Sequence, residues 1–336
     1  MRHLLIRCAL ASGLVACMPL SGAGADKYAA GLVDFPLIDP VENGPMRAMA
    51  VYPARTQGPA TQRGPFTIEA AIDAPAATGP LPLIVVSHGT GGSLLGHHDS
   101  MTALARAGFV AAAVEHPRDN FRDDSGFGTD LQLIGRPHHI VALIDGVLAH
   151  PRVGGLVDRS RIGMVGHSAG GYTALLIAGA RPNFDLMVEY RRAVPYDPLR
   201  DRADAASRER RKPELPYATD ARVRAIFLMA PALGYVFDRE GLAGVQVPVK
   251  LYRPSADELL AHPWNAERIA SMLPRPPEYE VLERAGHFVF LAPCSAAFAA
   301  QVPIICADPP SIDRGAIHKR LNADMVDFFA RTLPQR

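Results

Sequence analysis

The chain has 336 residues, of which 48% are hydrophobic and 21% are charged, and its formal net charge is +1. This length suits one large domain with an extensive core, and no linker interrupts the sequence, so we expect a single domain over residues 26–336. The nearly balanced charge argues against a nucleic-acid-binding protein.

Residues 1–25 have the features of an export signal. Two arginines precede a short apolar stretch, and Ala23-Gly24-Ala25 forms an A-x-A cleavage site. In an alternative interpretation, the residues that end at Cys17 resemble a bacterial lipobox, and Cys17 would be lipidated and anchor the protein to a membrane. Both interpretations predict an exported protein, periplasmic or extracellular. No later segment approaches the ~20 apolar residues of a membrane-spanning helix.

The hydrophobic pattern predicts strands that alternate with helices. The first segment, 26–45, is rich in proline and glycine and is expected to be irregular. Strands are expected at 47–52, 66–72, 83–86, 109–114, 162–165, 224–229, 247–252 and 279–282, and helices at 100–107, 140–149, 266–272 and 317–331. Continuous apolar strands between helices indicate an α/β fold with a mostly parallel central sheet covered by helices on both faces.

A strand, a sharp turn and a helix are predicted in succession over residues 161–177. The turn reads Gly166-His167-Ser168-Ala169-Gly170, which is the G-x-S-x-G pattern of a nucleophile elbow. Both glycines are needed because the serine sits in a tight, strained turn where larger side chains would collide with the neighbouring strand or helix. We therefore predict that Ser168 is a nucleophile. A purely structural Gly-Ser-Gly turn is the alternative.

The segment 181–220 breaks the alternation of strands and helices. It is long, contains several prolines and is highly charged. One interpretation is a solvated surface helix with ion pairs such as Asp204 with Arg208. The other is a charged cap, or lid, over the mouth of an active site.

A nucleophilic serine requires a base, and His287 is the candidate. It lies in the sequence Ala285-Gly286-His287-Phe288, directly after the last predicted strand. In elbow-type hydrolases the chain order is serine, acid, histidine, and His318 is the only histidine after His287. The position of His287 after the last strand brings its ring toward the elbow.

The acid that orients this histidine is expected to be Asp257, in the loop after the predicted strand 247–252. Glu258 is adjacent and chemically able, but we expect it to turn away toward the following helix. Asp238, after the preceding strand, is a more distant rival. The alternative for Asp257 itself is that it caps the helix that follows.

The oxyanion hole is expected from the N–H of Ala169 and one N–H of the loop Ser87-His88-Gly89-Thr90-Gly91-Gly92, which follows the predicted strand 83–86. Thr90 is our choice for the second donor, with the neighbouring glycines as alternatives. Glycines allow the backbone to approach a substrate oxygen closely. His88 is expected to be a structural hydrogen-bonding residue.

Cys294 and Cys306 are the two cysteines that lie outside residues 1–25. An even, closely spaced pair in an oxidising compartment predicts a disulfide, and two buried thiols are the alternative.

The histidine pairs 97–98 and 138–139 are adjacent in sequence, and adjacent side chains point apart. They lack the spacing of a zinc site, so we expect no metal and no other cofactor. The segment His116-Pro117-Arg118-Asp119 follows a strand and is expected to line the pocket without a catalytic step.

These motifs together resemble those of the α/β-hydrolases, over nearly all of residues 47–336, and within them the dienelactone-hydrolase-like branch that includes the platelet-activating-factor acetylhydrolases. The matching segments are residues 87–92, Glu115-His116-Pro117, residues 166–171 and Gly286-His287-Phe288. The resemblance implies a serine hydrolase. Dienelactone hydrolases use a cysteine where this chain has Ser168, which argues against a dienelactone substrate. Plasma-type acetylhydrolases place the acid after an earlier strand. This difference argues against a phospholipid substrate and favours Asp257 as the acid.

The leading hypothesis is an exported esterase that cleaves a small carboxylic ester or lipid through an acyl-enzyme on Ser168. The alternatives are a phospholipase A2-like lipid esterase and an acyltransferase that uses an alcohol instead of water. A non-catalytic binding protein is disfavoured because Ser168, Asp257 and His287 are all present. The acyl and alcohol groups and the oligomeric state do not follow from the sequence.

Overall fold

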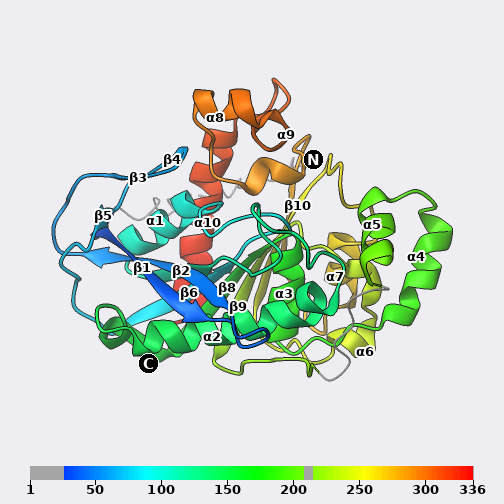
Figure 1. The fold of residues 1–336 in the computed structure, drawn as a ribbon, viewed down its shortest axis with the longest axis horizontal. Helices are drawn as coiled ribbons and strands as arrows, with labels where there is room; N and C mark the ends of the chain where they lie inside the picture. The colour runs from blue at the N-terminus through cyan, green and yellow to red at the C-terminus, as the bar shows by residue number, and fades with distance from the viewer. Residues whose placement is uncertain (1–25, 208–214, 336) are drawn as a thin grey trace, which may run out of the picture.

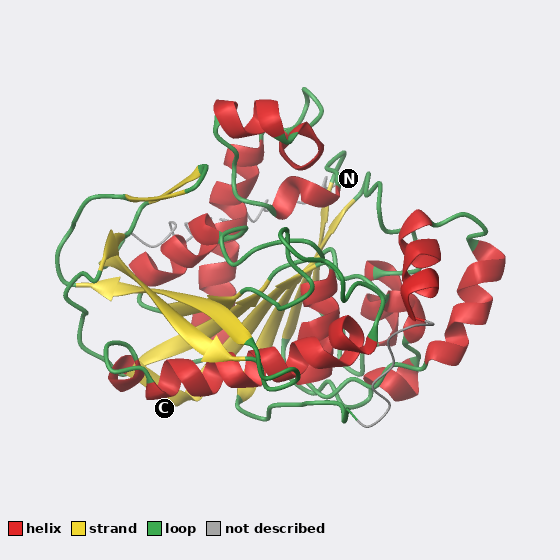
Figure 2. Cartoon of the chain, in the orientation of Figure 1, coloured by secondary structure: helices red, strands yellow, loops and turns green. Residues whose placement is uncertain are grey.

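The computed structural model describes residues 26–207 and 215–335, and it contains one nine-stranded sheet with helices on both faces (Figures 1 and 2). The strand order is β11-β10-β9-β8-β6-β7-β2-β1-β5. The strands are β1 (Ala29–Ile38), β2 (Pro45–Ala54), β5 (Ala71–Ile72), β6 (Leu81–Ser87), β7 (Val110–Val114), β8 (Val157–His167), β9 (Val223–Met229), β10 (Val249–Pro254) and β11 (Glu278–Leu282), and a separate hairpin is formed by β3 (Thr61–Arg63) and β4 (Phe66–Ile68). The predicted export signal and Cys17 lie outside the described residues.

From β7 to β11 each strand runs parallel to its neighbours, whereas β2 is antiparallel to both β7 and β1. The predicted mostly parallel sheet is therefore confirmed. Because the carboxyl ends of parallel strands lie at one edge, the loops after β6, β8, β10 and β11 meet there. These loops carry the glycine-rich segment 87–92, Ser168, Asp257 and His287.

The expectation that residues 26–45 are irregular is wrong, because they contain β1. This strand pairs with β2 along its whole length, from Ala29 opposite Ala54 to Ile38 opposite Pro45. On its other side it pairs with β5 only through Gly31 and Leu32. Pro36 thus lies in a part of β1 that forms a sheet edge, where a proline is tolerated. The predicted strand 66–72 is likewise two short strands, β4 and β5.

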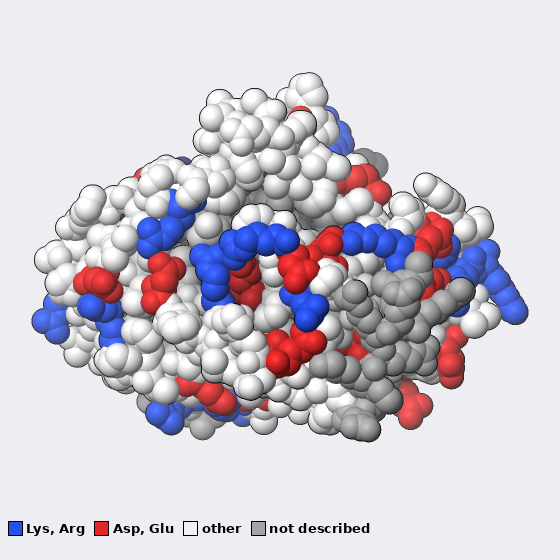
Figure 3. All heavy atoms as spheres, in the orientation of Figure 1, with Lys and Arg blue, Asp and Glu red and all other residues white. Residues whose placement is uncertain are grey.

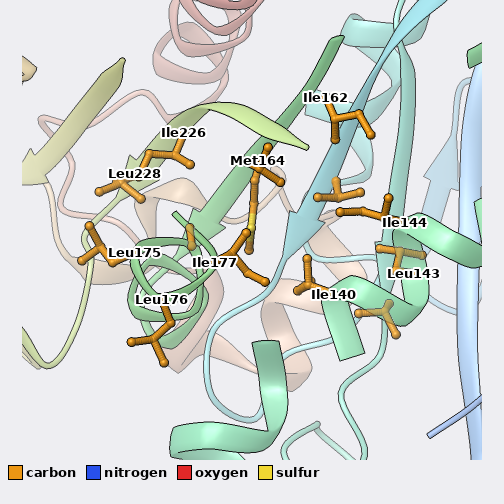
Figure 4. Packing of buried hydrophobic residues seen from close by; sticks show 14 of the residues in the cluster. Ile140, Leu143, Ile144, Ile162, Met164, Leu175, Leu176, Ile177, Ile226 and Leu228 are labelled. Carbon is orange, nitrogen blue, oxygen red and sulfur yellow. The ribbon is translucent and has the colours of Figure 1, made fainter. Parts of the chain in front are cut away.

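Helices pack on both faces of the sheet. The α-helices of the described residues are α1 (His98–Ala107), α2 (Arg136–Ala149), α3 (Ala169–Ile177), α4 (Met187–Ala193), α5 (Pro198–Ser207), α6 (Arg239–Leu242), α7 (Ala266–Met272), α8 (Ala296–Gln301), α9 (Pro303–Cys306) and α10 (Arg314–Thr332), and two pairs of them project away from the sheet (Figure 1). Alternate residues of β6 enter opposite cores: Val85 packs with α2 and α3, and Val86 packs with α1 and α10. Figure 4 shows the first core, where Met164 of β8 lies close to Ile177 of α3. These two cores fix the strand ends that carry the site.

The charged segment 181–220 contains α4 and α5, which project at one end of the molecule (Figure 1). Asp204 of α5 binds Arg191 of α4 with both oxygens, at 2.6 and 2.7 Å. The ring of Tyr190 stacks on Tyr235 with the centroids 3.9 Å apart, which anchors α4 to the body of the protein. Arg208, the expected partner of Asp204, lies outside the described residues.

A second projection, formed by α8 and α9, carries few charged side chains (Figures 1 and 3). Residues 288–307 contain no Asp, Glu, Lys or Arg, and Ile304 is 76% exposed. The predicted disulfide between Cys294 and Cys306 is confirmed, with a Cα–Cα distance of 5.7 Å. Within residues 26–207 and 215–335, every helix is too short or too polar to span a lipid bilayer.

Removal of this disulfide should lower the free energy of unfolding. A cross-link between residues 12 apart restricts the unfolded chain and contributes roughly 3 kcal/mol in the chain-entropy account. We expect the double variant Cys294→Ser/Cys306→Ser to lose about this amount in urea denaturation, and reduced wild-type protein to match it. Equal unfolding midpoints for the oxidised protein and the double variant would contradict this expectation.

Candidate active site

Ser168 occupies the turn between β8 and α3 in a strained backbone conformation. Its φ is 54° and its ψ is −118°, which a non-glycine residue adopts at a cost of about 1–3 kcal/mol. The turn is also tightly packed, since a Cβ on Gly166 would lie 2.2 Å from the carbonyl oxygen of Gly170, and one on Gly170 would lie 2.0 Å from that of Ser87. The two motif glycines are therefore required by close backbone contacts. Ser168 itself is partly exposed.

Asp257 binds the ring of His287. Asp257 Oδ2 lies 2.9 Å from His287 Nδ1, and Oδ1 accepts hydrogen bonds from the N–H groups of Leu259 and Leu260 at 3.0 and 2.9 Å. His287 is 2% exposed. Because a carboxylate only accepts hydrogen bonds, the proton of a neutral His287 ring resides on Nδ1, and Nε2 is left as an acceptor.

The two rival acids have other partners. We expected Glu258 to turn toward the following helix, and this is wrong. Its side chain accepts a hydrogen bond from the backbone N–H of His287 at 2.8 Å. This contact is possible because Gly286 has no side chain: a Cβ there would lie 2.8 Å from Glu258 Oε2. Asp238 caps α6 by accepting the N–H of Gly241 at 2.7 Å. Of the three carboxylates, Asp257 is the one that contacts the His287 ring.

The site brings Ser168, Asp257 and His287 to the same edge of the sheet, after β8, β10 and β11. The ring of His287 lies beside that of His167, the residue before the nucleophile candidate, with centroids 5.0 Å apart. His167 Nε2 is 3.3 Å from the carbonyl oxygen of His287. Within the described part of the chain, no hydrogen bond joins the Ser168 hydroxyl to His287. Such bonds are often long without substrate and shorten in the Michaelis complex.

The glycine-rich loop after β6 lies directly against Ser168. A Cβ on Gly89 would be 3.1 Å from Ser168 Cβ. The N–H of Gly91 is engaged by Asp119 Oδ1 at 3.2 Å, which leaves Thr90 and Gly89 as candidates for the second oxyanion donor. The N–H of Ala169 lies in the first turn of α3, where backbone N–H groups have no partner within the helix. Gly89 and Ala169 therefore lie directly beside Ser168, and Thr90 follows Gly89 in the loop.

Two groups selected from the sequence, His88 and residues 116–119, contact each other. His88 has both ring nitrogens engaged, by the carbonyl oxygen of Gly89 at 2.7 Å and by the N–H of His116 at 3.1 Å. His116 and Asp119 are 0% and 1% exposed, so the expectation that this segment lines the pocket is wrong for both. Arg118, with φ 55°, turns the chain so that Asp119 points inward.

Several buried histidines are neutral in the folded protein. Burial lowers the pKa values of His88, His116 and His167 well below the usual value, and it lowers the pKa of His97 to about 4. His97 Nδ1 donates to the carbonyl oxygen of Phe290 at 3.0 Å, and its buried Nε2 has no hydrogen-bond partner among the residues described. A second proton on this ring would therefore have no acceptor. Because protonation of these buried rings is unfavourable in the folded protein, the packing around the site is sensitive to acid.

The free energy of unfolding should fall with acidification. The unfolded chain protonates His97 near pH 6.5 and the folded chain only near 4, so stability is complete above pH 6.5 and is lost as the pH falls to about 4. This shift alone corresponds to about 3 kcal/mol. Urea denaturation at intervals of roughly one pH unit, from about pH 7.5 down to about pH 4.5, measures it. His97→Gln should show a shallower dependence, and an identical dependence in both proteins would contradict this origin.

The sheet order, the helices on both faces and the strand–turn–helix elbow define the α/β-hydrolase fold. The chain is similar in structure to a ferulic acid esterase from Streptomyces cinnamoneus, with a TM-score of 0.61 and 20% sequence identity over 93% of this chain and 92% of that one. No family model and no curated protein sequence matches the chain. No group of three His, Cys, Asp or Glu side chains in the described ranges could hold a metal ion.

Proposed function

We propose that the chain is an exported serine hydrolase that cleaves carboxylic esters through an acyl-enzyme on Ser168. The observation that carries this proposal is the 2.9 Å hydrogen bond from His287 to Asp257, at the sheet edge where Ser168 occupies its strained turn. A nucleophile, a base and a partly buried acid at one edge are the groups that acyl transfer requires.

In the proposed reaction, His287 Nε2 takes the proton of Ser168 Oγ as this oxygen attacks the ester carbonyl carbon. The oxyanion accepts hydrogen bonds from the N–H groups of Ala169 and Thr90. The ester C–O bond then breaks, and His287 gives its proton to the leaving alcohol. A water then attacks the acyl carbon as His287 takes its proton, the bond from this carbon to Ser168 Oγ breaks, and His287 returns the proton to Oγ as the carboxylic acid leaves. Asp257 keeps the ring in the required tautomer and stabilises the imidazolium. No cofactor takes part.

The substrate class follows from resemblance and one surface feature. One solved structure of similar fold is a ferulic acid esterase, and the sequence motifs resemble the dienelactone-hydrolase-like branch with its platelet-activating-factor acetylhydrolases. A small carboxylic ester, including an aromatic one, is the leading candidate. The uncharged projection of residues 288–307, which follows His287 directly, favours a lipid ester as the second candidate.

Export is supported by the sequence of residues 1–25 and by the disulfide, which persists in oxidising compartments. Lipidation of Cys17 would in addition anchor the protein to a membrane. We include the segment 181–220 in the proposal as a cap. Its helix α5 packs closely against the body of the protein, since a Cβ on Gly128 would lie 2.4 Å from Ala203 Cα.

Initial rates on a series of p-nitrophenyl esters, from acetate to palmitate, test this proposal together with methyl ferulate and phospholipid vesicles. We expect saturable hydrolysis of the p-nitrophenyl esters, and the chain-length optimum separates a small-ester enzyme from a lipid esterase. Product analysis with added alcohol separates hydrolysis from acyl transfer. Folded, exported protein that turns over none of these esters above the buffer rate would overturn the proposal.

A further inference from the structure

Asp119 connects the glycine-rich loop to the helix beneath it. Its Oδ1 accepts the N–H of Gly91 at 3.2 Å, and its Oδ2 accepts hydrogen bonds from Gln132 Nε2 at 2.9 Å and from Arg136 Nη1 at 2.7 Å. The side chains of Asp119 and Arg136 are each 1% exposed. A buried carboxylate with three donors has little freedom to move.

Arg136 holds the same loop at two further points. Its Nη2 donates to Ser87 Oγ at 3.2 Å and to the carbonyl oxygen of His88. Burial lowers the pKa of Arg136, and the negative charge of Asp119 opposes this shift and keeps the guanidinium charged. Since an unpaired buried charge would strongly destabilise the fold, the side chains of Asp119 and Arg136 stay paired. One guanidinium thereby reaches the start of the loop and, through Asp119, its middle.

Gln132 adds a contact to Thr90, the residue proposed as an oxyanion donor. Its Nε2 lies 2.8 Å from Thr90 Oγ1, and its Oε1 accepts the N–H of Gly128 at 2.8 Å. Gln132 belongs to a π-helical turn, Leu131–Gly135, that directly precedes α2. Single π turns often mark functional sites, and this one allows Gln132 and Arg136 to reach one carboxylate oxygen.

We propose that Asp119, held by Gln132 and Arg136, is a positioning residue that fixes the loop 87–92 in the conformation that directs a backbone N–H at the oxyanion. This inference rests on the proposed function. The loop contains Gly89, Gly91 and Gly92, and the φ of Gly91 is 63°, so its own sequence leaves it conformationally free. Four hydrogen bonds from Asp119, Arg136 and Gln132 to atoms of the loop select one conformation, and that selection matters most when charge develops on the substrate oxygen.

Arg136→Lys and Gln132→Met test this proposal without leaving the buried carboxylate of Asp119 unpaired. Lysine keeps the positive charge beside Asp119 but cannot reach Asp119, Ser87 and His88 together. Methionine removes the hydrogen bonds of Gln132 to Asp119, Thr90 and Gly128 and introduces no charge. Arg161→Lys is the matched control, because Arg161 is also buried and paired, with Asp158 at 2.8 Å, but lies in the amino-terminal half of β8.

The measurement is kcat per active site, with active sites counted by stoichiometric fluorophosphonate incorporation, together with KM and the thermal midpoint. We expect kcat to fall roughly 10- to 100-fold in Arg136→Lys and roughly 10-fold in Gln132→Met, with KM within about threefold of wild type. Arg161→Lys should keep the wild-type kcat. A thermal midpoint that falls while kcat per site stays at the wild-type value would show a merely structural role and overturn the proposal.

If Arg136→Lys does not fold, Gln132→Met decides the question by the same criterion. Ser168→Ala separates this inference from the proposed function. If Ser168→Ala remains active, the proposed function itself fails. If Ser168→Ala is inactive and both loop variants keep the wild-type kcat per site, only the positioning role fails.

Discussion

Replacement of Ser168 by alanine should lower kcat for ester hydrolysis on the order of 10⁴- to 10⁶-fold, the range found when the nucleophile of a serine hydrolase is removed. The hydroxyl oxygen forms the covalent bond of the acyl-enzyme, and no other group of the turn can replace it. The fold should persist, because alanine is smaller than serine and leaves the glycine contacts around the turn unchanged. Steady-state kinetics and circular dichroism measure the two effects.

Ser160→Ala is the control for this result. Ser160 lies in the same strand, β8, but is exposed and bonded to Asp158 at 2.7 Å at the opposite end of the strand. We expect wild-type kcat from Ser160→Ala. Turnover by Ser168→Ala at the rate of this control would refute the assignment of the nucleophile.

The second large effect is expected at Asp257. Asparagine in its place can present an N–H to the ring and favour the wrong tautomer of His287, so kcat for Asp257→Asn should fall on the order of 10⁴-fold. Glu258→Gln should have a mild effect. Glu258 accepts the backbone N–H of His287 at 2.8 Å, and the amide oxygen of glutamine can accept the same bond.

These two variants are a matched pair, because each changes one carboxylate to its amide at neighbouring positions. The pH dependence of kcat/KM for each variant should be recorded with the rates, since loss of the orienting acid changes the ionisation of the base as well as the rate. A crippling effect of Glu258→Gln with a mild effect of Asp257→Asn would reverse the roles that the hydrogen bonds indicate.

The sequence predicts the elbow well because its signal is local. Gly166, Ser168 and Gly170 lie within five residues, and the close contacts that require these glycines involve the turn itself and the adjacent loop. The parallel strands are also predictable, since each is a continuous apolar run. The sequence does not predict the strand β1, because proline and glycine in this segment indicate a turn unless the strand is known to lie at an edge.

The support of the glycine-rich loop could not be predicted in the same way. Asp119, Gln132 and Arg136 are separated from Gly91 by 28 to 45 residues and meet it only when β6, β7 and α2 pack together. The position of Asp119 after a strand is visible in the sequence but does not reveal its partners, and nothing in the local sequence distinguishes Gln132 and Arg136 from solvated polar residues of a helix. The same holds for Glu258, whose contact with the backbone of His287 depends on the pairing of β10 with β11. Local patterns predict the candidate reacting groups, and the structure is needed to find what holds them.

The central claim is that Ser168 is the nucleophile, and covalent labelling tests it most directly. Intact protein should be incubated with a fluorophosphonate, digested and mapped by tandem mass spectrometry. We predict one adduct per chain, on Ser168, with parallel loss of esterase activity and no labelling of Ser168→Ala. An adduct on another residue, or full activity in protein whose Ser168 is completely labelled, would contradict the claim.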